Sequence, residues 1–250
     1  MNPHLPADRE GRVYIGASGW NYREWRDSFY GGMPSKDWLG FYATRFDAVE
    51  VNATFYRQQR QSTFERWREQ TPADFAFAIK GHRFLTHVKR LLDPERPLHR
   101  CRAAAAGLGG KLAAVLWQMP RSLRKDMARL QRFADALAAW PEARHAMEFR
   151  HASWFDDDVA ACLSARRIAN CLSDAADWPM WDAVTTDLVY VRLHGHADTY
   201  ASSYAEGELA GWAGRVRDWQ AQGSEVHVYF DNTASGAALG NALRLKALLE

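Results

Sequence analysis

Cysteine is scarce in this sequence, which contains three cysteines among 250 residues. Their number is odd, and none of Cys101, Cys162 and Cys171 stands in a C-x-x-C pair. This scarcity argues against a disulfide framework and against a cysteine-rich structural zinc site. A reducing compartment fits best, so we expect a cytoplasmic protein.

Long apolar segments and an excess of one charge are lacking too. No stretch approaches 18 consecutive apolar residues, and the opening residues MNPHLPADREGR contain no apolar signal-peptide core. We therefore expect no membrane partner. With 32 basic and 30 acidic residues, the formal charge of +2 creates no long-range field toward nucleic acid. Nothing in the sequence indicates an oligomeric state.

Short runs of β-forming residues recur along the chain with helical patterns between them. The pattern indicates eight parallel strands joined by helices, and a sheet of eight such strands closes into a barrel. We therefore predict an α/β protein with a single (β/α)8 TIM-like barrel. The barrel would span residues 13–250, after an N-terminal extension of residues 1–12. The sixth crossover, 175–187, has no helical periodicity and should be irregular. The runs are 13–20, 48–56, 75–82, 111–120, 145–154, 168–174, 188–195 and 225–233.

Two of the intervening helices have clear signals. Apolar residues between Leu123 and Leu137 fall on one stripe at helical spacing, which predicts an amphipathic helix. Ser62 stands three residues before Glu65, a capping-box spacing that predicts a helix start, and Pro72 ends the pattern.

Six motifs occur in one order along nearly the whole chain. They are IGASGW (15–20), NATFYRQQRQSTFERWREQTPADFAFAIKGHRFLTH (52–87), GGKLAAVLWQMP (109–120), MEFRHASW (147–154), YVRLHG (190–195) and VYFDNTASGAALGNA (228–242). Together these motifs resemble the YecE-like family, a domain of unknown function called DUF72. The resemblance implies a TIM-like barrel and brings no established reaction. The family more often has a proline soon after the tyrosine at position 56, where this chain has Arg57-Gln58-Gln59.

Polar residues recur at the strand ends in one phase of the alternation. Barrel enzymes place their catalytic groups at the carboxyl ends of the strands, and alternate residues of a strand face the interior. We therefore predict that these side chains meet at the barrel mouth. They are Glu50, Asn52 and Thr54 on the second strand, Lys80 and His82 on the third, Gln118 on the fourth, Glu148 and Arg150 on the fifth, Arg192 and His194 on the seventh, and Asp231 with Asn232 on the eighth.

The residue types at this mouth favour an anionic ligand. Lys80, Arg150 and Arg192 would bind phosphate or carboxylate, and Glu50 or Glu148 could act as general base with His194 or His82 as the partner acid. A salt-bridge network that merely fills the upper barrel layer is the alternative. The candidate catalytic residues are Glu50, Glu148 and His194, and the candidate ligand-binding residues are Trp20, Asn52, Tyr56, Lys80, Gln118, Arg150, Arg192 and Asn232.

Two further features lie on the same predicted rim. The turns after the seventh and eighth strands could bind phosphate together with the start of the last helix, although Thr233 or Ser235 could simply cap that helix. Aromatic residues could form a stacking wall for a base or sugar, or they could pack loops. These aromatic residues are Trp20, Tyr22, Tyr56, Trp154, Tyr200 and Tyr204.

Three functions remain open on the sequence. The first is an enzyme, of hydrolase or isomerase type, that acts on a small anionic, phosphorylated or nucleotide-like ligand by acid-base or hydrolytic chemistry. The second is nucleic-acid binding or processing, and the third is a ligand-binding barrel without turnover. The second would use the predicted basic helix with Arg121, Arg124, Lys125, Arg129 and Arg132.

No cofactor is predicted. A divalent metal is an alternative if acids and histidines of the mouth converge, although the cations on the same strands would neutralise those acids. The possible ligands are Glu50, His82, Glu148, His194 and Asp231.

Overall fold

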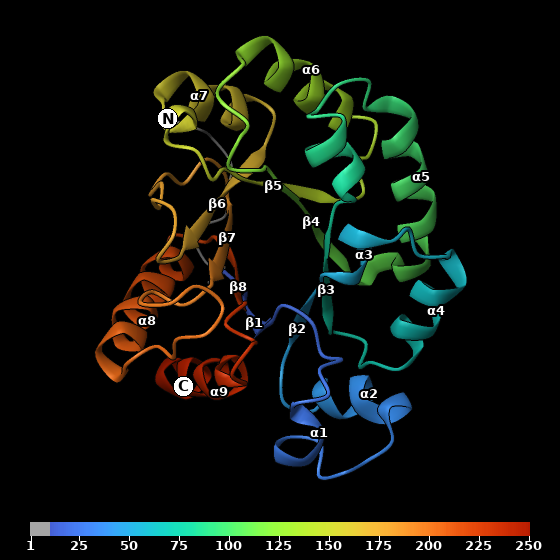
Figure 1. Ribbon diagram of the computed structural model, residues 1–250, viewed down its shortest axis with the longest axis vertical. Helices are drawn as coiled ribbons and strands as arrows, with labels where there is room; N and C mark the ends of the chain where they lie inside the picture. Colours follow the sequence, from blue (N-terminus) through green and yellow to red (C-terminus); the bar gives the residue numbers. More distant parts are fainter. Residues whose placement is uncertain (1–10) are drawn as a thin grey trace.

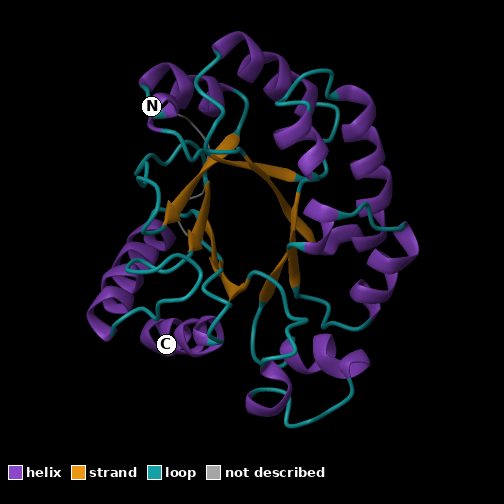
Figure 2. Ribbon diagram, viewed as in Figure 1, coloured by secondary structure: helices purple, strands orange, loops and turns teal. Residues whose placement is uncertain are grey.

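Eight parallel strands form a barrel in the computed structural model, which describes residues 11–250. Figure 2 shows the strands as an inner ring with the helices outside it. Each predicted run overlaps one strand, so the predicted barrel is confirmed. Of the predicted extension, residues 1–10 lie outside the described residues. The strands are β1 (Val13–Ala17), β2 (Ala48–Val51), β3 (Ala76–Lys80), β4 (Leu112–Gln118), β5 (Arg144–Glu148), β6 (Ile168–Asp174), β7 (Leu188–Leu193) and β8 (Glu225–Phe230).

Helices alternate with the strands and cover the outside of the barrel (Figure 1). The crossover between β6 and β7 contains neither helix nor strand, which confirms its predicted irregularity. Within the described chain, no helix combines the length and apolar content needed to cross a bilayer. The helices are α1 (Trp25–Ser28), α2 (Trp38–Tyr42), α3 (Ala53–Tyr56), α4 (Gln61–Glu69), α5 (Glu95–Ala105), α6 (Met127–Leu137), α7 (Asp157–Ala165), α8 (Glu206–Ala221) and α9 (Ala237–Leu249).

Two predicted helix starts differ from the structure. The stripe that begins at Leu123 becomes helical only at the start of α6, because the Asp126 side chain accepts a hydrogen bond from the Arg129 amide at 2.9 Å and caps the helix there. The predicted capping box at Ser62 is wrong, since α4 already begins at Gln61. Glu65 instead accepts a hydrogen bond from the Gln61 side chain at 2.9 Å.

The strands contribute side chains of unequal size to the barrel interior. Below the mouth, β2 to β6 carry mostly alanine, whereas β7 and β8 contribute Tyr190 and Tyr229. The large rings occupy the space that the small side chains leave, so the interior is packed without bulky residues on every strand. A second, larger apolar cluster fills the layer between strands and helices. The interior alanines are Ala48, Ala76, Ala78, Ala114, Ala146 and Ala169.

The barrel closes between β1 and β2 with the help of the Tyr42 side chain. These strands share a single bridge, Ser18 to Glu50, and no continuous ladder. There is no room for a side chain at position 16, because a Cβ on Gly16 would lie 1.9 Å from the Ala48 carbonyl oxygen. The Tyr42 hydroxyl accepts a hydrogen bond from the Ala17 amide at 2.7 Å and donates one to the Ala48 carbonyl at 3.1 Å. This hydroxyl therefore replaces a missing strand-to-strand hydrogen bond.

Replacing Tyr42 with phenylalanine should lower the free energy of unfolding by about 1–3 kcal/mol, because a buried amide and a buried carbonyl lose their partner. Denaturant titration of the variant and the wild type measures this difference. Tyr56→Phe is the matched control, since Tyr56 is 70% exposed and should lose nothing. If Tyr42→Phe is as stable as Tyr56→Phe, the seam does not depend on the hydroxyl.

Candidate functional site

Every strand contributes one polar side chain to the mouth of the barrel at its carboxyl end. All eight of these residues are buried. Six belong to the phase predicted from the sequence; the other two, Ser18 and Ser173, were missed, although the alternation through Gly16 and Cys171 leads to them. The eight residues are Ser18, Glu50, Lys80, Gln118, Glu148, Ser173, Arg192 and Asp231.

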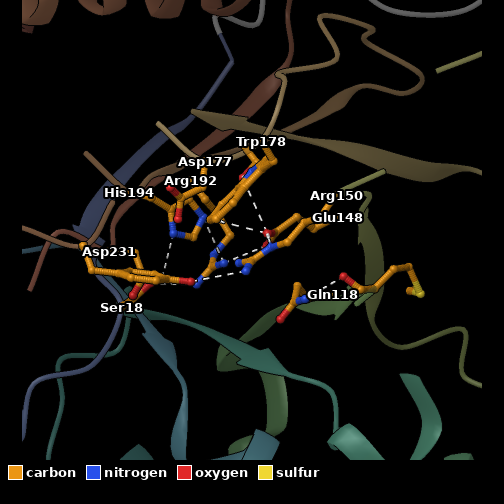
Figure 3. A network of polar contacts seen from close by, with 12 residues as sticks. Ser18, Gln118, Glu148, Arg150, Asp177, Trp178, Arg192, His194 and Asp231 are labelled. Carbon is orange, nitrogen blue, oxygen red and sulfur yellow. Dashed lines mark hydrogen bonds and ion pairs between the residues drawn. The ribbon is translucent and has the colours of Figure 1, made fainter. Parts of the chain in front are cut away.

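Arg192 on β7 lies at the centre of this layer and has no exposed surface (Figure 3). Its Nη1 donates to Glu148 at 2.6 Å, and its Nη2 donates to Glu50 at 2.8 Å and to Asp231 at 2.9 Å. Its Nε lies 3.1 Å from both Glu50 oxygens. One guanidinium thus joins carboxylates from β2, β5 and the end of β8, and its donors are occupied by protein groups.

Glu50 receives donors from β7 and from the end of β1. Besides the contacts with Arg192, the Ser18 hydroxyl donates to Oε1 at 2.5 Å, and the Tyr190 hydroxyl donates to Oε2 at 2.6 Å. Tyr190 is one of the large rings of the barrel interior, so the network continues downward into the core. A carboxylate with this many donors is held in one orientation.

Glu148 lies between two guanidinium groups. Its Oε1 accepts from Nε of Arg150 at 2.5 Å, and its Oε2 accepts from Arg192. Burial by itself would raise the pKa of Glu148, but the charges of Arg150 and Arg192 hold that pKa well below its usual range. Glu148 is therefore ionised at neutral pH and is a weak proton acceptor in this state.

His194, which follows β7, is neutral and has one ring nitrogen beside Arg192 and the other close to Asp231. Its Nε2 lies 3.2 Å from Nη1 of Arg192, and its Nδ1 lies 3.0 Å from Oδ2 of Asp231. Because a guanidinium only donates, Nε2 must accept, which places the ring proton on Nδ1, toward Asp231. Burial, with the charge of Arg192, lowers the pKa of His194. Burial would raise the pKa of Asp231, yet Arg192 brings it below its usual range.

Lys80 takes part in the charge layer without a direct ionic contact. It makes no ion pair with any described residue, and its Nζ lies 4.4 Å from the centre of the Phe55 ring. The residue is 8% exposed. Burial, and after it the charge of Arg192, lowers the pKa of Lys80 to about 8. A fraction of this amine is therefore uncharged near neutral pH.

Arg150, just after β5, also has an unused donor. Its Nη1 donates to the Tyr200 hydroxyl at 3.2 Å, and its guanidinium carbon lies 3.9 Å from the centre of the Trp178 ring. Its Nη2 is buried and has no hydrogen-bond partner within the described chain. Buried donors normally have a partner, so this one is a candidate contact for an acceptor from outside the protein.

The remaining predicted ligand-binding residues lie in different places. Asn52 borders the mouth, with Nδ2 3.4 Å from the Ser18 carbonyl oxygen and a buried Oδ1 that has no hydrogen-bond partner among the described residues. Gln118 turns its Nε2 onto the carbonyl of the next residue, Met119, at 2.6 Å. Tyr56 is on the exposed side of α3, which begins two residues after β2 ends.

Trp20, Asn232 and His82 make contacts with residues outside the Arg192 network. Trp20 packs edge to face against Trp67 of α4, with 5.1 Å between ring centres. The Asn232 side chain donates to Ser202 and Asn241, so it joins a loop to α9. His82 follows the end of β3 and accepts a hydrogen bond from the backbone of the next turn at 3.2 Å. Ligand binding by each of the predicted site residues stays a prediction.

The aromatic rim differs in part from the prediction. Trp154 and Tyr204 are core residues, with Trp154 bound to the Leu123 carbonyl and Tyr204 to Asp174. Tyr22 does approach the mouth, since its hydroxyl donates to the Ser18 carbonyl at 2.6 Å. Trp178 was missed from the sequence, because it lies in the irregular crossover where no periodicity could place it (Figure 3).

The sequence left open whether Thr233 or Ser235 caps α9, and this helix starts in another way. Gly236 precedes the helix with φ of 76°, a left-handed conformation that suits glycine, and no side chain caps the helix there. The Ser235 hydroxyl donates to the Ala201 carbonyl at 2.7 Å instead. Neither Thr233 nor Ser235 is therefore the N-cap, while phosphate binding at this helix start stays a prediction.

The residues predicted to form a basic helix do not share one. Arg121, Arg124 and Lys125 precede α6, and only Arg129 and Arg132 lie in it. Three of the five make ion pairs, which are Lys125 with Asp156, Arg121 with Asp177 and Arg129 with Asp126. This pairing removes the observation that favoured nucleic acid, which remains untested as a partner.

The predicted alternative of a metal ion has no cluster to hold it. In the part of the chain that the structure describes, no three His, Cys, Asp or Glu side chains converge in a way that could bind a metal. The carboxylates of the mouth contact Arg192 instead. Their chemistry in this state is that of an ion-pair network.

Comparisons with known proteins agree with the barrel architecture. A family model described as "Protein of unknown function DUF72" matches residues 14–250. UPF0759 protein YunF of Bacillus subtilis (strain 168) is 26% identical over 273 residues, which cover 95% of each chain, and UPF0759 protein YecE of Escherichia coli (strain K12) is 28% identical over 57% of this chain and 50% of its own. The crystal structure of a DUF72 family protein from Thermotoga maritima MSB8 has a TM-score of 0.84 at 27% identity, covering 95% of this chain and 99% of that one.

Proposed function

The chain belongs to the DUF72 family, whose function is unknown, and from the geometry of its barrel we propose that the mouth binds a small anionic ligand, phosphorylated or nucleotide-like, and acts on it by acid-base or hydrolytic chemistry. One observation carries this proposal: Arg150 Nη2 is a buried donor without a partner in the described chain, beside a layer that also contains the unpaired ammonium of Lys80. A phosphate or carboxylate oxygen would satisfy both kinds of donor.

The attraction for an anion comes from these free donors and not from surplus positive charge. The layer and Arg150 together contain three carboxylates, two guanidinium groups and the Lys80 amine, so their charges sum to about zero when Lys80 is protonated. Arg192 is already fully engaged with carboxylates. Lys80 and Arg150 are therefore the residues that we assign to the ligand, and Arg192 holds the layer together.

The proton-transfer group that this arrangement favours is Lys80. Its lowered pKa of about 8 lies near physiological pH, as an efficient general base requires. Glu50, Glu148 and His194 remain candidate catalytic residues, but each would first have to exchange a partner inside the network. Tyr200, which is 38% exposed and accepts a hydrogen bond from Arg150, supplies a ring against which a base or sugar could pack.

Calorimetric titration with inorganic phosphate, adenosine monophosphate and uncharged adenosine tests this function. We expect phosphate-bearing compounds to bind and adenosine to bind more weakly. Arg150→Gln should weaken binding of the monophosphate by roughly 10- to 100-fold, because a charge-assisted hydrogen bond contributes about 1.5–3 kcal/mol.

Arg121→Gln is the matched control for this experiment. The Arg121 guanidinium also lies over the Trp178 ring, at 4.8 Å, but it is half exposed and pairs with Asp177. It should bind the monophosphate as the wild type does. The proposal fails if no phosphate compound binds, or if both variants lose affinity equally, since a general loss of positive charge would then account for the effect.

A further inference from the structure

Lys80 differs from the other five lysines because it is buried while its Nζ has no hydrogen-bond or ion-pair partner among the described residues. Lys111 donates to the carbonyl oxygens of Arg68 and Thr71, and Lys36 is on the exposed surface. Among the described residues, Lys80 is the one lysine that is buried and makes neither an ion pair nor a hydrogen bond through Nζ. The other three form ion pairs, which are Lys89 with Asp93, Lys125 with Asp156, and Lys246 with Asp47.

The surroundings of Lys80 favour nucleophilic chemistry at nitrogen. The backbone of Lys80 is fixed, because its carbonyl oxygen lies 2.7 Å from the Thr54 hydroxyl and the next amide, of Gly81, donates to the Leu116 carbonyl at 2.8 Å. The ammonium lies over the Phe55 ring, and burial lowers its pKa to about 8. A desolvated lysine of this kind has an available lone pair, which is what an amine nucleophile needs.

We propose that Lys80 forms an imine with an aldehyde or ketone that carries a phosphate or carboxylate group, which Arg150 binds through Nη2. The inference rests on the proposed function, because it names the substrate class of the same site. The nucleophile, Lys80, ends β3, and the anion-binding donor, Arg150, follows β5. The charge of Glu148 interacts with both.

The reaction balances without any further reagent. The neutral Lys80 amine attacks the carbonyl carbon, its nitrogen loses a proton, and the carbonyl oxygen gains one to give a carbinolamine. The C–O bond then breaks with a second protonation of that oxygen, and the nitrogen lone pair forms the C=N bond. Overall, a lysine ammonium and a carbonyl compound yield a protonated imine and one water molecule. The protonated imine withdraws electrons from the adjacent carbon, which makes its C–H bond acidic and suits isomerase-type chemistry.

Reductive trapping tests the imine. The purified protein is incubated with dihydroxyacetone phosphate, pyruvate or uncharged acetone in the presence of sodium cyanoborohydride, and the adduct is located by peptide mass spectrometry. We expect the anionic probes to label Lys80 at least about tenfold more than any other lysine, since a bound carbonyl has a high effective concentration. Lys111 is the internal control, because its Nζ is occupied by carbonyl oxygens.

Two variants make the result specific. Lys80→Met should remove the adduct while intact-protein circular dichroism shows a folded chain. Arg150→Gln should reduce labelling by dihydroxyacetone phosphate and leave the weak labelling by acetone unchanged, because only the anionic probe uses the guanidinium. Equal labelling of Lys80 and Lys36, or equal labelling by acetone and dihydroxyacetone phosphate, would overturn the inference.

Titration and trapping together distinguish a refuted imine from a refuted anion site. If titration shows that phosphate and adenosine monophosphate bind and Lys80 is never trapped, the imine is refuted while the proposed function stands. If neither phosphate compound binds and no lysine is trapped, both are refuted.

Discussion

Replacing Arg192 with methionine is expected to lower the free energy of unfolding by about 3–5 kcal/mol at pH 7, the range measured when one partner of a buried ion pair is removed. Arg192 is completely buried and contacts three carboxylates at 2.6–2.9 Å. Methionine has a similar length and no charge, so the loss reports the uncompensated carboxylates and not a cavity. Urea denaturation followed by tryptophan fluorescence measures it.

The effect of pH on this variant has a definite sign. In the wild type, Arg150 and then Arg192 lower the pKa of Glu148, and Arg192 lowers that of Asp231, so the contribution of these carboxylates to stability is present above the ordinary carboxyl pKa and is lost as pH falls through the lowered native values. Without the Arg192 guanidinium, burial and repulsion between the carboxylates should raise the pKa of Asp231, and the pKa of Glu148 should rise toward its usual range because only Arg150 still lowers it strongly. The deficit of Arg192→Met relative to wild type should therefore be largest near pH 7 and shrink toward pH 5.

Two further variants show whether the buried network causes this loss of stability. Arg192→Lys retains the charge but not the planar set of five donors, so it should fall between the wild type and the methionine variant. Arg166→Met removes a surface pair with Asp135 and should change stability by less than about 1 kcal/mol. If Arg192→Met is no less stable than Arg166→Met, the buried network does not stabilise the barrel.

The alternation of the strands made most of the mouth predictable from the sequence. In a closed barrel a side chain with the right phase can only point inward, so Glu50, Lys80, Glu148 and Arg192 could be placed together although they lie far apart in the chain. Their meeting follows from strand geometry. Which atoms they share does not, because contact depends on barrel register and rotamers that no periodicity encodes.

Strand alternation could not predict the positions of residues outside the helices and strands. Trp178 and Tyr200 reach Arg150 from irregular segments between strands, where spacing in the sequence says nothing about direction. Asn232 lies one residue beyond the inward-facing Asp231 and contacts Asn241 on α9, a contact that strand alternation does not predict. Trp154 was expected on the rim, but a short turn after β5 buries it beneath Leu123.

Replacing Lys80 with methionine should move stability and ligand affinity in opposite directions. At pH 7 the free energy of unfolding should rise by about 1–3 kcal/mol, because a lowered lysine pKa means that folding at this pH confines an ammonium at an energetic cost. Binding of phosphate compounds should weaken by roughly 10- to 100-fold, since a charge-assisted contact is lost. Paired chemical denaturation and calorimetry measure both quantities.

The pH dependence of the stability difference identifies its origin. Burial and Arg192 lower the pKa of Lys80 to about 8, against the partial compensation from Glu148, Asp231 and Glu50. The unfolded chain keeps its lysine protons until higher pH, so between pH 8 and roughly 10.5 the unfolded state binds more protons and the wild type gains stability as pH rises. The advantage of Lys80→Met should thus be constant below pH 8 and decline above it. An advantage that does not change with pH would mean that packing of the methionine against Phe55, and not the buried charge, causes it, and Lys80 would then lose its claim to be the reactive amine of the mouth.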